Sequence, residues 1–318
     1  MAENVREKKS PRAAYGKALV ELGRENKNIV VLDADLSCST QTCAFAKEFP
    51  ERFFNVGIAE QDLMTTAAGL STTGKIPFVS TFAMFASGRA WEQIRNTIAY
   101  PKFNVKIVST HGGITVGEDG ASHQALEDVA LMRLIPNMLV IVPADCRETQ
   151  QVVKFAAQYD GPVYIRISRT SVCDIFDENY KFNPFKAEIV VEGADATVVT
   201  NGETLIETIV AAEILKKENI NIEVIHMPIV KPIDKKTILT SVAKTGLAIT
   251  VENHSIIGGV GSAVAEVLCE ELPSRLVRIG TNDEFGQSGE QRVLMEHYGL
   301  TAEKLADRMK NIIKNQGK

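Results

Sequence analysis

The sequence predicts an α/β protein made of two doubly wound domains. Short apolar runs rich in β-branched residues alternate with segments of helical periodicity. A polar segment over residues 171–186 interrupts this alternation, and the length of 318 residues is enough for two ordinary domains. We therefore expect a first domain over residues 10–170, a linker over 171–186 and a smaller domain over 187–318.

The first domain is expected to begin with a helix that Ser10 caps and Pro11 opens. Apolar runs typical of buried parallel strands follow over residues 28–33, 53–56, 77–80, 105–109, 138–143 and 163–167. Helices are expected between them over residues 60–69, 82–94, 126–134 and 147–158. Ligands of such sheets bind beyond the carboxyl ends of the strands, so the loops that follow the strands are candidate site segments.

The second domain repeats the alternation on a smaller scale. Strands are expected over residues 196–200, 222–225 and 248–251, and helices over 204–218, 235–243 and from Ala302 onward. The glycine-rich run over residues 258–262 lacks the full nucleotide-binding fingerprint. We interpret it as tight packing between a strand and a helix.

Composition excludes several classes of protein. Hydrophobic residues make up 45% of the chain and charged residues 24%, which is the balance of a soluble globular protein. The net charge of −5 leaves no basic excess for nucleic acid, and no apolar run reaches the roughly 20 residues of a membrane span. The amino-terminal residues lack the apolar core of a signal peptide. The five cysteines are scattered without a CxxC pair, so we expect reduced thiols in the cytoplasm.

Three side chains of the first domain are candidates for ring binding and acid–base chemistry. Glu60 stands where a buried helix is expected to begin, and a capping acid is the alternative interpretation. Phe82 and Phe85 are three residues apart at the expected start of the helix over 82–94. They would present two rings on one face, although such a pair alone is usually part of a core.

The glycine-rich loop over residues 111–124 carries His111, Asp119 and His123. Its glycines allow the backbone to approach a ligand closely. Metal binding is one interpretation, but the loop lacks HxxxH and HxH spacing. General acid–base chemistry or hydroxyl recognition is favoured.

Further polar residues follow the helix start and the strand ends of the same domain. Arg12, Ser39 and Arg169 are each typical surface residues when taken alone. Together with His111 they could hold a phosphate, because the planar guanidinium fork of arginine matches phosphate oxygens.

Taken in order, these motifs resemble the transketolases. The matching runs are GIAE at residues 57–60, STFAMF at 80–85, THGGITVGEDGASHQ at 110–124 and SR at 168–169. The resemblance covers nearly the whole chain. It implies a pyrimidine-binding domain for thiamine diphosphate, followed by a transketolase C-terminal domain.

The resemblance also implies roles for the candidate residues. Glu60 would hydrogen-bond N1′ of the cofactor's aminopyrimidine, and Phe82 and Phe85 would stack against that ring. Asp35 and Ile58 would line the cofactor site. The family often has a third aromatic residue where this chain has Gly88, which changes the shape of the ring pocket.

The substrate would be held by the loops around the cofactor. The resemblance implies that Asp119 reads a donor-sugar hydroxyl and that His111 and His123 bind substrate oxygens and transfer protons. The substrate phosphate would be surrounded by Arg12, Ser39, His111 and Arg169.

The chain lacks the GDG…N motif with which a complete transketolase binds the cofactor pyrophosphate and a metal ion. The resemblance therefore implies a C-terminal subunit of a transketolase encoded as two polypeptides. The N-terminal subunit would hold Mg²⁺ or Ca²⁺, no metal site is expected in this chain, and two copies of each chain would form a heterotetramer. The expected reaction is reversible transfer of a two-carbon ketol unit from a ketose phosphate to an aldose phosphate, in the pentose phosphate pathway.

Three alternatives stay open from the sequence. The β subunit of a 2-oxo acid dehydrogenase shares the domain order but is not expected to carry the GEDG…HQ run with His111 upstream. A 1-deoxy-xylulose-5-phosphate synthase resembles the chain around His123 but usually lacks a histidine at the position of His111. A non-catalytic assembly partner would have no need of Glu60, His111, Asp119 and His123 together.

Overall fold

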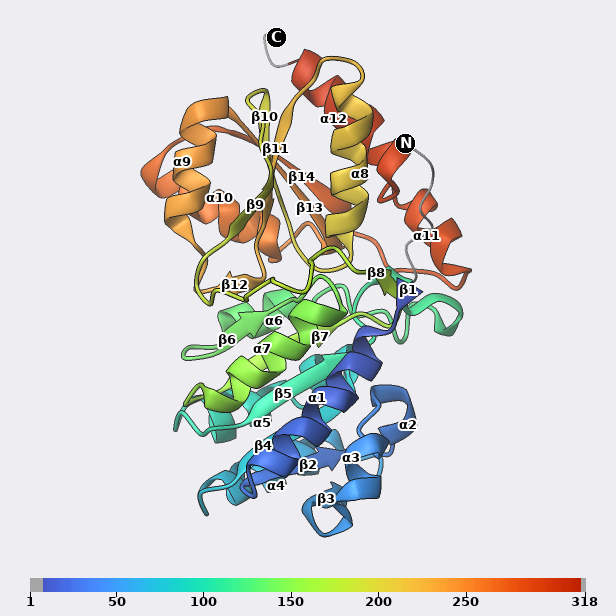
Figure 1. Cartoon of the computed structure of the whole chain (residues 1–318), viewed down its shortest axis with the longest axis vertical. Coiled ribbons are helices and arrows are strands. Elements are labelled where there is room, and N and C mark those ends of the chain that lie inside the picture. The colour runs from blue at the N-terminus through green and yellow to red at the C-terminus, as the bar shows by residue number, and fades with distance from the viewer. Residues whose placement is uncertain (1–7, 316–318) are drawn as a thin grey trace.

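The structure is a computed structural model that describes residues 8–315. The chain forms two open β-sheets, and each sheet is packed between helices. The seven-stranded sheet lies in the lower half of Figure 1 and the five-stranded sheet in the upper half. Within the two sheets most neighbouring strands are parallel, and helices cover both faces of each sheet. The predicted α/β fold class is confirmed.

The seven-stranded sheet has the order β12-β6-β7-β5-β4-β2-β3. Its strands are β2 (Ile29–Asp33), β3 (Phe53–Asn55), β4 (Ile76–Phe82), β5 (Lys106–Thr110), β6 (Leu139–Ile141), β7 (Val163–Ile167) and β12 (Ile229–Lys231). All neighbours are parallel except β12, which comes from the second half of the chain and pairs antiparallel with β6. β2, β5 and β7 are buried along their whole length, which explains their continuous apolar runs.

Helices pack on both faces of this sheet. One face is covered by α1 (Pro11–Glu25), α3 (Cys43–Glu48) and α7 (Cys146–Gln158), seen in front of the sheet in Figure 1. The other is covered by α4 (Glu60–Ser71), α6 (Asp128–Leu134) and two π-helical turns, Phe85–Arg89 and Ile94–Ala99, that flank α5 (Trp91–Gln93). The Ser10 hydroxyl accepts a hydrogen bond from Ala13 N at 3.3 Å and Pro11 begins α1, as predicted.

The five-stranded sheet has the order β14-β13-β10-β11-β9. Its strands are β9 (Glu188–Val191), β10 (Ala196–Thr200), β11 (Ile222–His226), β13 (Leu247–Ser255) and β14 (Arg275–Thr281). Its helices are α8 (Thr204–Lys216), α9 (Lys235–Thr245), α10 (Val260–Glu271), α11 (Gln291–His297) and α12 (Ala302–Lys314). The hydrophobic core under α9 and α10 continues into the core under α4 and α6, so one cluster of buried side chains joins the two halves.

Short elements connect the halves. β1 (Lys8–Lys9) pairs antiparallel with β8 (Val172–Cys173), and residues 174–187 form neither a helix nor a strand. We retain residues 171–186 as the proposed linker.

The structure corrects one element of the candidate site. Phe82 was expected at the start of a helix over 82–94, but it is the last residue of β4, because Phe78 to Phe82 pair residue by residue with β5. The π-helical turns and α5 then replace the single predicted helix. The sequence also gave no signal for β9 and β14, which are edge strands with partly exposed residues and therefore lack a continuous apolar run.

Among residues 8–315, no helix combines the length and the apolar character that crossing a bilayer requires.

Candidate active site

The candidate residues gather at one edge of the seven-stranded sheet. Neighbouring β2, β4, β5 and β7 are parallel, so their carboxyl ends meet at this edge. The loops and turns that follow them carry Asp35, Ser39, Phe85, His111 and Arg169. The structure thus brings together side chains from four separate segments.

Four rings form the centre of the site. Phe82 stacks on His111 with ring centroids 3.8 Å apart, and on Phe85 with centroids 5.8 Å apart. His123 meets both phenylalanines edge-on, at 5.3 Å from Phe85 and 6.3 Å from Phe82. The correction to β4 places Phe82 on a strand, yet the two phenylalanine rings still lie side by side with an interplanar angle of 18°.

His111 is held as a buried, neutral imidazole. Its backbone has a φ of +62°, and its Nδ1 shares a 2.7 Å hydrogen bond with the Thr110 hydroxyl. Burial lowers the pKa of His111 to about 3, and the nearby charges of Arg12, Arg169 and His123 lower it as well. At neutral pH the ring can therefore accept or donate a hydrogen bond without carrying charge.

Glu60 begins α4 and its side chain is only 4% exposed. The position favours a carboxylate because the backbone amides of a helix start point toward it. Arg89 Nη1 lies 3.1 Å from Glu60 Oε1 and 3.3 Å from Oε2. The Arg89 guanidinium also lies over the Phe85 ring, with Cζ 4.3 Å from the centroid, so one cation touches both the buried acid and the ring cluster.

Asn55 joins the loop before Glu60 to the loop after β2. Its Oδ1 accepts from the backbone amides of Asp35 at 3.1 Å and Gly57 at 3.0 Å, and its Nδ2 donates to Asp35 Oδ1 at 3.0 Å. Asp35 has a φ of +64° and Gly57 a φ of +75°, so both turns need this support. The predicted cofactor residues Asp35 and Ile58 have exposed side chains, Ile58 to 76%.

A buried carboxylate shapes the loop that presents Ser39. Asp33 Oδ1 accepts from Leu36 N at 2.6 Å, and Oδ2 accepts from the hydroxyls of Thr40 at 2.7 Å and Thr42 at 2.9 Å. Burial raises the pKa of Asp33, while these hydrogen bonds act in the opposite direction. The carboxylate thereby fixes the short helix α2 (Ser37–Thr40) that contains Ser39.

Arg12 and Arg169 line the same open pocket of about 470 Å³. Arg12 Nη1 donates to the Ser39 carbonyl at 2.7 Å, while its buried Nε has no hydrogen-bond partner. Burial and the neighbouring Arg169 lower the pKa of Arg12. Arg169 donates to the Val116 carbonyl and forms an ion pair with Glu118 at 3.3 Å. The pocket thus holds two guanidinium groups, one of which has unused hydrogen-bonding capacity.

The glycine-rich loop folds into 3₁₀ turns over Ile114–Asp119 that bend at Gly117, whose φ is +83°. Asp119 ends these turns with an exposed side chain, and the Ser122 hydroxyl lies 3.0 Å from His123 Nδ1. Asp119 therefore lies in the segment that carries His123, but at the surface of the site.

Two residues of the second half anchor this loop, and sequence reasoning missed both. Asn253 Oδ1 accepts from Ile114 N at 2.9 Å. Glu203 accepts from the Thr115 hydroxyl at 2.8 Å, from the Ser168 hydroxyl and from Asn253 Nδ2. Glu203 follows the carboxyl end of β10, so the strand-end rule applied to the second sheet would have singled it out.

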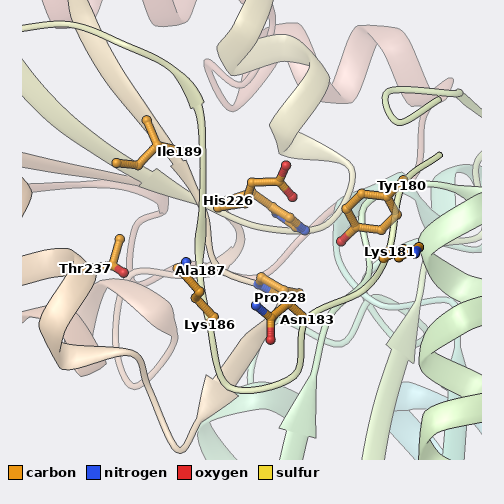
Figure 2. A pocket seen from close by; sticks show the side chains of 10 residues that line it. Tyr180, Lys181, Asn183, Lys186, Ala187, Ile189, His226, Pro228 and Thr237 are labelled. Carbon is orange, nitrogen blue, oxygen red and sulfur yellow. The ribbon is translucent and has the colours of Figure 1, made fainter.

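A second pocket, of about 430 Å³, lies away from the ring cluster and is drawn in Figure 2. It lies between residues 180–189, β11 and α9, and none of the predicted site residues lines it. At its wall His226 Nε2 lies 2.8 Å from Glu148 Oε2, and the Tyr180 hydroxyl donates to Glu148 Oε1 at 2.8 Å. These contacts tie the linker to both halves, which is a structural role.

Within residues 8–315, no group of three or more histidine, cysteine or acidic side chains is arranged to hold a metal ion. The two histidines of the glycine-rich loop are paired with rings and hydroxyls instead.

Comparison with protein families shows to which family the chain belongs. Residues 7–174 match the transketolase pyrimidine-binding domain and residues 185–305 match the transketolase C-terminal domain. The chain belongs to the transketolase family. Membership of this family implies thiamine diphosphate as the cofactor.

Individual transketolase relatives agree. A Methanocaldococcus jannaschii protein with the provisional name transketolase C-terminal section is 53% identical over 311 residues, 97% of this chain and 98% of that protein. Human transketolase is 38% identical over 313 residues, 97% of this chain and 50% of the human protein. A solved structure described as a split gene transketolase in an inactive beta4 tetramer has a TM-score of 0.89 and 54% identity, covering 96% of this chain and 98% of that chain. This chain therefore corresponds to the C-terminal section of a transketolase.

Proposed function

We propose that this chain is the C-terminal subunit of a thiamine diphosphate-dependent transketolase made of two kinds of polypeptide. The reaction is reversible transfer of a two-carbon ketol unit from a ketose phosphate to an aldose phosphate, as in the pentose phosphate pathway. The observation that carries the proposal is the buried Glu60 carboxylate, which Arg89 links to the stacked rings of Phe82 and Phe85. Family membership supports the reaction class.

The residues fit the aminopyrimidine half of the cofactor. A flat heteroaromatic ring needs an apolar face and a hydrogen-bonding edge. Phe82 and Phe85 offer an apolar surface for the face of the ring, and Glu60 offers a hydrogen-bonding group for its edge. The Arg89 guanidinium contacts both Glu60 and Phe85, so the two features lie close together. Asp35 and Ile58 would lie at the rim, where their side chains are exposed. When bound, thiamine diphosphate supplies the carbon–carbon bond chemistry.

The chain's own residues would orient the cofactor and transfer protons to and from the substrate. Glu60 would share a hydrogen bond with N1′ of the pyrimidine. His111 is neutral at physiological pH, so it can exchange a hydrogen bond with a substrate hydroxyl and transfer a proton together with His123. Asp119 would bind a donor-sugar hydroxyl from the surface of the site.

The substrate phosphate would lie in the pocket of Arg12 and Arg169. The unpartnered Nε of Arg12 and the neighbouring Ser39 support this assignment. The phosphate oxygens would accept hydrogen bonds from both guanidinium groups, and the neutral His111 ring would donate a further one.

We further propose an N-terminal subunit as partner, which would carry the pyrophosphate-binding domain and the Mg²⁺ or Ca²⁺ ion. The chain spans half the length of human transketolase, and a similar chain forms a tetramer described as inactive. Both observations support an enzyme that needs a second polypeptide, and two copies of each chain would give a heterotetramer. The scattered, odd set of cysteines supports a cytoplasmic location.

Similarity to transketolase relatives favours this proposal over the β subunit of a 2-oxo acid dehydrogenase and over 1-deoxy-xylulose-5-phosphate synthase. The remaining alternative is a non-catalytic assembly partner, and the proposed activity is favoured over it by the site. The juxtaposition of His111 with Phe82 supports the activity, because a degenerate copy has no need to keep a buried histidine in its ring cluster.

Reconstitution tests the proposal. The chain is expressed with a candidate N-terminal subunit, and ketol transfer from xylulose 5-phosphate to ribose 5-phosphate is measured with thiamine diphosphate and Mg²⁺. We expect turnover only when both chains are present. A stable complex of the two chains that transfers no ketol unit would contradict the proposed reaction.

A further inference from the structure

The contact between Arg89 and Glu60 has an unusual combination of exposures. The Glu60 side chain is 4% exposed, whereas that of Arg89 is 53% exposed. One guanidinium nitrogen lies within 3.3 Å of both carboxylate oxygens. A buried carboxylate without a partner is costly, so the arginine reaches in from the surface to compensate its charge.

The backbone around Arg89 is arranged for this reach. Arg89 ends the π-helical turn Phe85–Arg89, and its carbonyl accepts a 3.2 Å hydrogen bond from Gln61 Nε2 of α4. The preceding Gly88 is exposed, and a Cβ at this position would come within 3.1 Å of the Met84 Cε methyl. π-Helical turns are rare and are frequent at functional sites.

The guanidinium makes the two kinds of contact that the proposed function assigns to the aminopyrimidine. It is planar and donates to Glu60, and it lies over the Phe85 ring with Cζ 4.3 Å from the centroid. One Arg89 nitrogen bonds to both oxygens of Glu60 while the guanidinium covers Phe85, so a ring that stacks on this face of Phe85 and bonds to Glu60 would overlap the arginine. The half-exposed side chain is free of tight packing on its outer side and can swing toward solvent.

We propose that Arg89 is an internal occupant of the pyrimidine position in the cofactor-free chain, and that the cofactor must displace it. The inference rests on the proposed function, because it assumes that Glu60 and the ring cluster bind the pyrimidine. Arg89 pairs with the buried carboxylate until a ligand with a matching edge and face arrives. It thereby weakens binding of the pyrimidine to the isolated chain.

A binding measurement on the full chain tests this without the partner. The probe is 4-amino-5-hydroxymethyl-2-methylpyrimidine, the pyrimidine half of the cofactor, titrated against the labelled chain by NMR. We expect Arg89→Gln to bind the probe about five-fold more tightly than wild type, the effect of removing one partly exposed ion pair. Arg95→Gln serves as the control, because Arg95 is an exposed residue of the next turn whose guanidinium bonds to Asn96.

Two further variants separate the possible outcomes. Arg89→Lys keeps the ion pair but not the planar group, so its affinity should lie between those of wild type and Arg89→Gln, and it covers the case in which Arg89→Gln folds poorly. Glu60→Gln should weaken binding of the pyrimidine probe, whether it is introduced into wild type or into either Arg89 variant. Unchanged or weaker binding by Arg89→Gln, with a clear loss in Glu60→Gln, overturns the role of Arg89 and leaves the proposed function standing. Binding that is insensitive to Glu60→Gln contradicts the proposed cofactor site itself, and no binding by Arg89→Gln overturns the inference.

Discussion

The Phe82 ring stacks on the His111 imidazole, with centroids 3.8 Å apart and an angle of 26° between the planes. Phe82 ends β4 and His111 follows the end of β5, and these strands are parallel neighbours with Phe82 opposite Thr110. The phenyl ring therefore covers one face of the imidazole at the sheet edge. This contact accounts for part of the burial that keeps His111 neutral.

Removal of the Phe82 ring is expected to destabilise the chain. Phe82 is 7% exposed, so Phe82→Ala leaves a cavity between β4 and His111 and should lower the free energy of unfolding by about 3 kcal/mol. Phe54→Ala is the control, because Phe54 is 39% exposed and should cost less than about 1 kcal/mol. Urea unfolding of both variants measures the difference, and equal losses would contradict the packing described for Phe82.

The low pKa of His111 predicts a loss of stability in acid. In the folded chain the imidazole takes up a proton only near pH 3, whereas an unfolded histidine does so near pH 6.5. Between these values the unfolded state binds more protons, so stability falls as the pH drops through 6.5 and the loss is complete near pH 3.

The measurement compares wild type with His111→Gln. From about pH 8 to about pH 5 the free energy of unfolding of wild type should fall by about 2 kcal/mol more than that of the variant. Burial lowers the pKa of His254 to about 4, and that group titrates in the same range in both proteins, so the difference isolates His111. Parallel pH profiles would show that His111 is not held neutral.

The sequence indicated where the candidate residues gather because strand ends are recognisable. Apolar runs located β2, β4, β5 and β7, and the loops after them carry the residues that gather at one edge. The prediction failed where tertiary pairing overrides local pattern. Phe82 reads as the start of a helix but pairs with β5, and β12 crosses from the second half to the first sheet, which no local signal indicates.

Other residues were missed because their roles depend on contacts across the chain. Arg89 looks like an ordinary surface arginine, and only the fold brings it to Glu60. Asn55 has no distinctive local pattern, yet it holds the turns at Asp35 and Gly57. Spacing in the sequence cannot reveal such long-range hydrogen bonds.

The two guanidinium groups predict selectivity for phosphorylated substrates. In the reconstituted enzyme, Arg12→Gln or Arg169→Gln should raise KM for a ketose phosphate by about 10- to 100-fold, the effect of losing a charge-assisted hydrogen bond. KM for an unphosphorylated ketose should change little. Arg24→Gln is the matched control, because Arg24 lies on α1 with Arg12 but pairs with Glu48 at the surface. An equal rise in KM for both kinds of substrate would contradict the proposal that Arg12 and Arg169 bind the substrate phosphate.

Glu203 is expected to stabilise the glycine-rich loop from the second half. Glu203→Ala leaves the donors of Thr115, Ser168 and Asn253 without their buried acceptor and should cost about 2 to 3 kcal/mol. The loop should also become more sensitive to limited proteolysis. Glu213→Ala, at an exposed position of α8, should cost less than about 0.5 kcal/mol. Similar behaviour of the two variants would mean that Glu203 does not anchor the loop.

The most direct test of the account is the turnover of the reconstituted enzyme with Glu60→Gln. The substitution keeps the shape of a side chain that is 4% exposed but removes its carboxylate, so assembly with the partner should persist. Asp62→Asn, an exposed acid of the same first turn of α4, is the control and should turn over like wild type. We predict that Glu60→Gln lowers kcat about 100-fold or more. Turnover by Glu60→Gln near that of wild type would contradict the assignment of this edge of the sheet as the cofactor site.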